Sequence, residues 1–168
     1  MKKALFSIIS LVMVIFTLVP TVFAQNEKMP EWQDLVLSQE EFNAILANNT
    51  IHTAGEDTRA NDLIHLYAIA ISKSGTNTLN IAGKTTGTAD VVKSGFKEVV
   101  VQRRASSSAS WSDYYTYEDI YVDMGSYTIA KSLTVPTGYQ YRVTCIHYAK
   151  KNFLSVQTID NVSNVIQF

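Results

Sequence analysis

The segment LTVPTGYQYRVTCIHYA, residues 133–149, decides the fold of this chain. From residue 139 onward, apolar or small side chains alternate with mostly polar ones, and the side chains of a β-strand point to its two faces in turn. Every second residue therefore belongs to one inner face. These residues are Tyr141, Val143, Cys145, His147 and Ala149. The alternation predicts one half-buried strand over residues 139–149.

A turn precedes this strand. Pro136 has no N–H to give to a sheet ladder and Gly138 tolerates unusual backbone angles, so the chain turns there. Proline, glycine and then Tyr141 resemble the corner between strands E and F of immunoglobulin-like and fibronectin-type-III-like sandwiches, where a tyrosine hydroxyl folds back onto the corner backbone. Tyr141 precedes Cys145 by four residues rather than two, so Val143 fills the later position, as in the fibronectin-like variant. An ordinary buried strand is the alternative.

The first 24 residues have the pattern of a secretory signal peptide. Lys2 and Lys3 precede an apolar run over residues 4–19, and a small-residue site ends at Ala24. The run is nearly long enough for a transmembrane anchor, but Pro20 and the Val-x-Ala end favour cleavage after Ala24. We therefore expect a secreted protein with no transmembrane segment in its mature chain.

Charge divides the rest of the chain into an acidic leader and a mildly basic body. Residues 25–62 hold eight acidic and two basic residues, whereas residues 63–168 hold seven acidic and ten basic ones. We interpret the leader as solvated polar sequence, with docking on the body as the alternative. Ser38 and Glu41 form a capping box ahead of apolar residues at helical spacing, which predicts a short helix over residues 39–48.

Residues 63–168 form one predicted β-domain. The expected strands cover residues 63–72, 78–85, 96–104, 111–121, 127–135, 139–149 and 153–168, with a break in the last near residues 160–161 and a minor strand at 91–92. Both faces of residues 63–72 are apolar, which suggests that the leader helix covers one of them. Short strands with regular turn signals predict an all-β, immunoglobulin-like (fibronectin-type-III-like) antiparallel β-sandwich of about seven strands, preceded by a short N-terminal helix. A jelly roll or small barrel is the alternative.

Cys145 is the only cysteine, so no internal disulfide stabilises the fold. We interpret it as a small buried strand residue. A nucleophilic thiol needs an exposed, electropositive setting and a base; His147 lies two residues along the same face, where side chains point the same way without meeting well. An enzyme would use Cys145 with His147, or Asp113 with Asp119. No catalytic, metal-binding or cofactor-binding motif appears, so we expect no catalytic residues, no metal and no cofactor.

Residues 111–121 contain the densest aromatic cluster. Simple alternation places Trp111, Tyr115, Tyr117 and Tyr121 on one face, where they are candidate ligand-binding residues. Their flat amphipathic rings would stack on sugar rings or anchor a protein partner. We favour the interpretation that divides the rings between the core and the rim, because strands favour aromatic residues for packing alone.

Basic residues give a second candidate surface. Arg103, Arg104, Arg142, Lys150 and Lys151 would bind anionic wall polymers or lipids if they met on one face. They lie on different predicted strands and the positive excess is small, so we interpret them as solvated charge. The same lack of a strong basic bias argues against nucleic acid as a partner.

Three runs resemble a known family: ISKSGTNTLNIAG from Ile71, VQRRASSSASW from Val101 and LTVPTGYQYRVTCIHYAKK from Leu133. Together with the signal peptide they resemble an uncharacterised family of small secreted proteins of Gram-positive bacteria. The resemblance covers residues 65–155, implies export and a β-sandwich, and brings no catalytic residues with it.

The expected function follows from these features. We expect a non-enzymatic extracellular binding or interaction module whose partner is an extracellular protein or a cell-wall glycan. A secreted effector or toxin-like protein, and a hydrolase, are the alternatives.

Overall fold

The structure is a computed structural model that describes residues 32–50, 52–53 and 62–168. The expected signal peptide, residues 1–24, and residues 54–61 of the leader lie outside the described residues. No helix in the described part of the chain has the length and apolar character needed to cross a bilayer.

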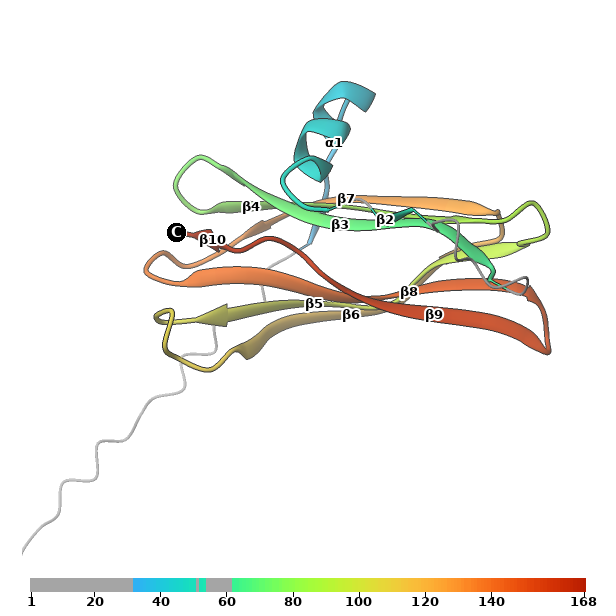
Figure 1. The fold of residues 1–168 in the computed structure, drawn as a ribbon. Coiled ribbons are helices and arrows are strands. Elements are labelled where there is room, and N and C mark those ends of the chain that lie inside the picture. The colour runs from blue at the N-terminus through green and yellow to red at the C-terminus, as the bar shows by residue number, and fades with distance from the viewer. Residues whose placement is uncertain (1–31, 51, 54–61) are drawn as a thin grey trace, which may run out of the picture.

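Two antiparallel sheets face one another (Figure 1). The first has the strand order β1-β7-β4-β3-β2, and the second has the order β10-β8-β5-β6 with β9 also paired to β8. The strands of the first sheet are β1 (Gln33–Asp34), β2 (His52–Thr53), β3 (Ile64–Ser74), β4 (Thr78–Gly87) and β7 (Ser126–Thr134). Those of the second are β5 (Lys93–Arg104), β6 (Ser112–Val122), β8 (Gln140–Asn152), β9 (Ser155–Val162) and β10 (Ile166–Gln167). This arrangement is an immunoglobulin-like sandwich, so the predicted fold class is confirmed.

The main core lies between the two sheets. The first sheet contributes mainly β-branched and leucine side chains from β3, β4 and β7, and the second contributes residues of β5 and β8. The largest of them are Ile69, Ile71, Leu79, Ile81, Ile129 and Leu133 from one side and Phe96, Val99, Val101, Tyr141 and Val143 from the other. Burying this apolar surface is the main stabilising contribution in a domain whose one cysteine is free.

Strand β8 alternates between buried and partly exposed residues along most of its length, as predicted. Tyr141 and Val143 are completely buried and Cys145 is 3% exposed. The Tyr141 hydroxyl donates a hydrogen bond of 2.8 Å to the carbonyl oxygen of Pro136, and Gly138 has a φ of +87°, which side-chain-bearing residues rarely adopt. The predicted tyrosine corner is therefore confirmed.

Helix α1 (Gln39–Leu46) packs on the outer face of the first sheet (Figure 1). Its N-terminus has the predicted capping box, in which Ser38 and Glu41 bond each other's backbone N–H groups. Three apolar side chains of the helix are buried against small residues of the sheet; the contacts are Phe42, Ile45 and Leu46 against Ala68, Ala70 and Ala82. The solvated interpretation of the leader is therefore wrong for residues 32–50, because alanines on the outer face of the sheet leave room for a helix.

Two smaller predictions are also wrong. The last strand is interrupted at residues 163–165 rather than at 160–161, because the Ser163 backbone N–H donates to the Val143 carbonyl while its hydroxyl accepts from the Val143 N–H. Residues 91–92 form no strand; Val91 is buried in a small cluster with Leu63, Ile64 and Ala149 at one end of the sandwich.

Candidate ligand-binding face

The four aromatic residues predicted to share a face are divided between the two faces of β6. Tyr115 and Tyr117 pair with the buried residues Val101 and Val99, so they point toward the opposite sheet. Tyr121 instead pairs with Gly95 and stacks on Tyr148, on the outer face, with ring centroids 4.6 Å apart. The candidate arrangement with all four rings on one face is therefore wrong, and the favoured division between core and rim describes the strand.

Two irregularities in β6 cause this division. The pairing with β5 shifts between Val101 and Gln102, so that Tyr115 and Asp113 oppose neighbouring residues of β5. Farther along, Asp119 has a φ of +56°, and a residue in the left-handed conformation interrupts strand alternation. Each irregularity exchanges the two faces, and neither is visible in a count of sequence positions.

Trp111 lies on the outer face of the second sheet between two arginines. The Cζ atoms of Arg104 and Arg142 lie 4.4 Å and 4.5 Å from its ring centroid. A guanidinium at this distance is attracted to the electron-rich face of an indole. We call Arg104, Trp111 and Arg142 the arginine–tryptophan site.

Glutamines hold both arginines of this site in place. The Arg104 Nε donates to Gln140 Oε1 and the Arg142 Nε donates to Gln102 Oε1, each at 2.8 Å. These bonds connect β5 and β8, so the site is built on two paired strands rather than on a mobile loop.

The arginine–tryptophan site is electropositive. The ion pairs within the described residues join Lys131 to Asp34 and Lys151 to Asp90, and no carboxylate in this part of the chain pairs with Arg104 or Arg142. Asp113, the carboxylate on the neighbouring strand, accepts instead from the Gln102 amide at 2.8 Å. The pKa of Arg142 is lowered, first by burial and then by the like charge of Arg104.

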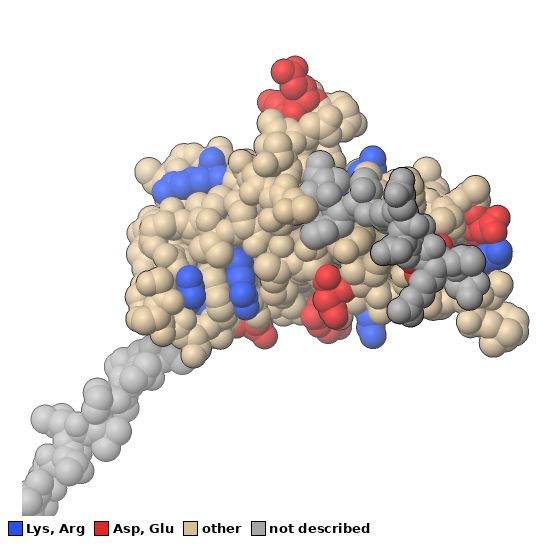
Figure 2. All heavy atoms as spheres, in the orientation of Figure 1, with Lys and Arg blue, Asp and Glu red and all other residues tan. Residues whose placement is uncertain are grey.

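The arginine–tryptophan site brings together only part of the predicted basic surface. Arg103 points to the core side, where its Cζ lies 4.5 Å from the ring of Tyr114. Lys150 lies opposite Lys93 in the β5–β8 register, at the other end of the same sheet. Figure 2 accordingly shows charges of both signs scattered over one face of the molecule rather than one continuous basic field.

Tyr117 packs between Trp32 and Tyr115 at the open side of the sandwich. Its ring contacts Trp32, which immediately precedes β1, the edge strand that pairs with β7. The pKa of Tyr117 is raised, mainly because burial disfavours its ionised form. Its hydroxyl oxygen is buried without a hydrogen-bond partner in the described residues.

Cys145 and His147 meet inside the sandwich, contrary to the expectation from their spacing. The sulfur of Cys145 lies 3.4 Å from the Nε2 atom of His147. The Thr85 hydroxyl lies 2.7 Å from Nδ1 and donates to the Gly95 carbonyl at 3.0 Å. Because Thr85 gives its proton to that carbonyl, it accepts from Nδ1–H, which leaves Nε2 as an acceptor for the Cys145 S–H.

This geometry makes the thiol unsuitable as a nucleophile. His147 is completely buried, and burial raises the pKa of the Cys145 thiol, with a smaller contribution from the negative charge of Asp160. A catalytic cysteine requires the opposite change. Asn161, which the sequence analysis considered only as part of a strand break, lies 3.5 Å from the same Nε2; its position between Asp160 and Val162 carries no signal of that contact.

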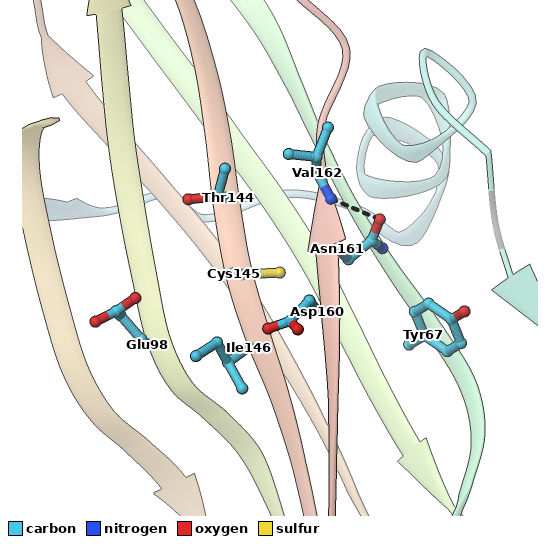
Figure 3. Close-up of a pocket in the computed structure, with 8 residues that line it drawn as sticks. All are labelled: Tyr67, Glu98, Thr144, Cys145, Ile146, Asp160, Asn161 and Val162. Carbon is cyan, nitrogen blue, oxygen red and sulfur yellow. Dashed lines mark hydrogen bonds between the residues drawn. The ribbon is translucent and has the colours of Figure 1, made fainter. Parts of the chain in front are cut away.

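A hollow lies beside Cys145, at the junction of β8 and β9 (Figure 3). Its wall mixes apolar and acidic residues; they include Tyr67, Glu98, Ile146, Asp160 and Val162. In the described residues no group of three histidine, cysteine or carboxylate side chains is arranged to hold a metal ion. The hollow therefore presents acids on an open surface beside a protonated thiol, without a paired nucleophile and base.

Comparison with known proteins adds little to this geometry. No family model matches the chain, and no curated protein matches it. Among solved structures, the chain is similar to the GAE domain of GGA2p from Saccharomyces cerevisiae, with 8% sequence identity and a TM-score of 0.28, over 71% of this chain and 96% of that one. So low a score carries no argument, and the fold rests on the strand order and the corner described above.

Proposed function

We propose that this chain is a secreted, non-enzymatic binding module that holds an anionic extracellular polymer on the outer face of its second sheet. The observation that carries the proposal is the arginine–tryptophan site: two ordered guanidinium groups flank one indole ring and have no carboxylate partner among the described residues. The signal-peptide pattern and the resemblance to secreted Gram-positive proteins support export.

The chemistry of the site favours an anion over a neutral sugar. A guanidinium presents five N–H donors in a planar fork that matches carboxylate and phosphate groups. The Arg142 Nε is held by Gln102, so its terminal nitrogens remain as donors toward a ligand. A bound anion would also offset the repulsion between Arg104 and Arg142, which contributes less than burial does to the lowered pKa of Arg142.

Trp111 has a positioning role in this proposal. Its ring holds two guanidinium groups, which differs from the sugar-stacking role predicted from sequence. Tyr115 and Tyr117 contribute no contact to the ligand, because they face the core. Tyr121 lies toward the opposite end of the same face, beside Lys93.

The absence of an enzymatic role stays part of the proposal, and three contacts support it. The Cys145 thiol is buried and donates to His147. Asp119 accepts a hydrogen bond of 3.0 Å from the Tyr121 hydroxyl, and Asp113 accepts from Gln102. The Cys145–His147 pair is therefore buried. Asp113 and Asp119 each accept a hydrogen bond from a side chain that is neither a base nor a nucleophile.

The test measures binding to three immobilised polymers: polyglycerol phosphate, hyaluronate and neutral dextran. We expect the wild-type protein to bind the two anionic polymers, with an affinity that falls as the salt concentration is raised, and not to bind dextran. The double substitution Arg104→Gln with Arg142→Gln should weaken binding by at least about tenfold, since it removes charge-assisted hydrogen bonds. Replacing both arginines by lysine should give an intermediate loss, because charge is kept and the planar fork is lost.

The matched control removes the same charge elsewhere. Lys84→Gln with Lys97→Gln lowers the net charge by the same amount at positions away from the site, and we expect at most a twofold to threefold change in affinity from long-range electrostatics, which salt screens. Equal losses in the two double variants would show non-specific attraction and contradict the proposal. Urea unfolding of every variant checks that the fold is retained.

A further inference from the structure

An apolar tip projects from one end of the sandwich, at the turn between β8 and β9. Phe153 and Leu154 are the two central residues of this turn, between the paired residues Asn152 and Ser155. Their exposures are 83% and 80%. In Figure 1 this hairpin, coloured orange to red, reaches the right-hand end of the molecule. Two adjacent large apolar side chains in water at a convex point give the fold no stabilisation.

Other exposed apolar residues gather around this tip. Of the eight large hydrophobic side chains that are exposed in the described residues, five lie at this end: Val92, Met124, Phe153, Leu154 and Val156. Two bonds hold the neighbouring loops beside β8 and β5. The Val92 N–H donates to the Lys150 carbonyl at 2.9 Å, and the Ser94 hydroxyl donates to the Met124 carbonyl at 2.8 Å.

The turn itself does not require these residues. Two-residue hairpin turns favour glycine, asparagine and aspartate, which tolerate the left-handed conformation. Here the Asn152 side chain closes the turn by accepting from the Leu154 N–H at 2.9 Å, and neither central residue has a positive φ. Polar residues would serve equally well at both positions, so turn geometry does not account for phenylalanine and leucine.

Lysines stand behind the tip. Lys93 and Lys150 are direct cross-strand partners, and no carboxylate in the described part of the chain forms an ion pair with either. Like charges directly opposite each other destabilise a sheet, and the Lys93 ammonium lies 4.9 Å from the ring centroid of Tyr121 on the outer face. Lys151, one residue nearer to the tip, pairs with Asp90. Two more acids lie at this end: Asp123 in the turn between β6 and β7, and Asp62, which accepts from the Gln157 amide and lines a hollow together with Leu154.

We infer that this end of the sandwich docks on an anionic lipid bilayer. Phe153 and Leu154 enter the boundary between head groups and acyl chains, while Lys93 and Lys150 face lipid phosphates. A bilayer suits a convex tip because it deforms around it, whereas a second copy of this chain would need a matching apolar socket. Lys93 and Lys150, which form no ion pair in the described residues, favour anionic over neutral lipids.

The expected strength is that of a reversible peripheral contact. Each large apolar side chain that leaves water contributes roughly tenfold in partitioning, and each lysine near an anionic surface contributes roughly fivefold. Together these contributions are comparable to the marginal anchoring by a single acyl chain. The contact would therefore hold the protein near a membrane without fixing it there.

The test is sedimentation with vesicles of phosphatidylcholine containing phosphatidylglycerol, compared with pure phosphatidylcholine. We expect the chain that begins at Gln25 to bind the anionic vesicles, and Phe153→Ser with Leu154→Ser to reduce that binding by roughly a hundredfold. Val36→Ser removes an apolar side chain that is 95% exposed elsewhere and should leave binding unchanged. All variants share one N-terminus, so its contribution cancels.

A reporter variant tests insertion directly. In Phe153→Trp, subtracting the spectrum of the parent protein isolates the emission of the added tryptophan. This emission should shift to shorter wavelength with anionic vesicles and be quenched by brominated acyl chains. Unchanged vesicle binding by the double serine variant would overturn the inference, as would tip-dependent dimers in sedimentation velocity. The double variant Arg104→Gln with Arg142→Gln should retain vesicle binding. The membrane inference and the proposed polymer site are therefore tested by different variants, and either can fail without the other.

Discussion

Replacing Tyr141 by phenylalanine tests the feature on which the fold rests. The substitution removes only the hydroxyl that donates to the Pro136 carbonyl at 2.8 Å and leaves the ring in place. The ring at position 141 keeps its edge-to-face contacts with Tyr114 and Phe168, which have centroid distances of 6.0 Å and 5.5 Å in the wild type. The measured change in stability should therefore report the corner hydrogen bond rather than a cavity.

The magnitude follows from the surroundings of that bond. A hydrogen bond within a protein contributes about 0.5–1.5 kcal/mol net, and a buried acceptor left unpaired costs about 1–3 kcal/mol. Pro136 is partly exposed, so water can reach its carbonyl. We expect a loss of about 1–2 kcal/mol, which lowers the urea midpoint by roughly 0.5–1 M at an unchanged slope.

The pH dependence of the same variant provides a second measurement. The pKa of Tyr141 is raised to about 12, mainly by burial. Between pH 10 and 12 the unfolded chain loses this proton while the folded chain keeps it, so wild-type stability falls as pH rises through this window. The slope from one residue is at most about 1.4 kcal/mol per pH unit. The variant lacks this group, so the stability difference between the two proteins should shrink above pH 10.

Equilibrium urea unfolding followed by tryptophan fluorescence measures both effects. Tyr148→Phe is the control, because Tyr148 lies on the outer face of the same strand and packs against Tyr121 without a hydroxyl bond in the described residues. Its stability should stay within about 0.5 kcal/mol of wild type. Equal losses for Tyr141→Phe and the control, or a stability difference that does not change with pH, would refute the reasoning.

Three further substitutions test other parts of the structure. Gly95→Ala should cost about 3 kcal/mol of stability or prevent folding, because Gly95 has a φ of +155° and an added Cβ would collide with the Ile120 carbonyl oxygen. Thermal unfolding measures this loss, and an unchanged stability would contradict the backbone geometry. Ser38→Ala should cost about 1 kcal/mol through the lost helix cap, seen in the same assay, and no loss would mean that α1 needs no cap. The Cys145 thiol should react with a disulfide reagent only after denaturation, because it is buried and protonated; rapid labelling of native protein would disprove its burial.

The Cys145–His147 contact shows why proximity alone does not indicate a catalytic pair. Its 3.4 Å separation would suit a thiolate and an imidazolium in an active site. Here Thr85 holds the imidazole in the tautomer that accepts from the thiol, and both groups lie inside the sandwich. A satisfied polar chain in the core gives the packing a specific arrangement and leaves the sulfur without reactivity.

Local patterns predicted the parts of the fold that depend on neighbouring residues. The alternation along β8, the turn at Pro136 and Gly138, and the capping box at Ser38 are all present in the structure. These features arise from backbone sterics, side-chain periodicity and hydrogen bonds within a few residues. A single sequence therefore contains enough information to place them.

The tertiary structure alone decided the candidate site. Which face of β6 each aromatic residue occupies depends on pairing shifts against β5 and on the left-handed conformation of Asp119. The partners of Trp111 include Arg142, which is 31 positions away and comes close only because β8 and β6 flank β5. Helix α1 likewise packs on Ala68, Ala70 and Ala82 because the folded sheet brings these residues of β3 and β4 together on its outer face. Periodicity fixes whether a residue alternates, but the register between strands determines what it meets, and that register is set by the packing of the whole sandwich.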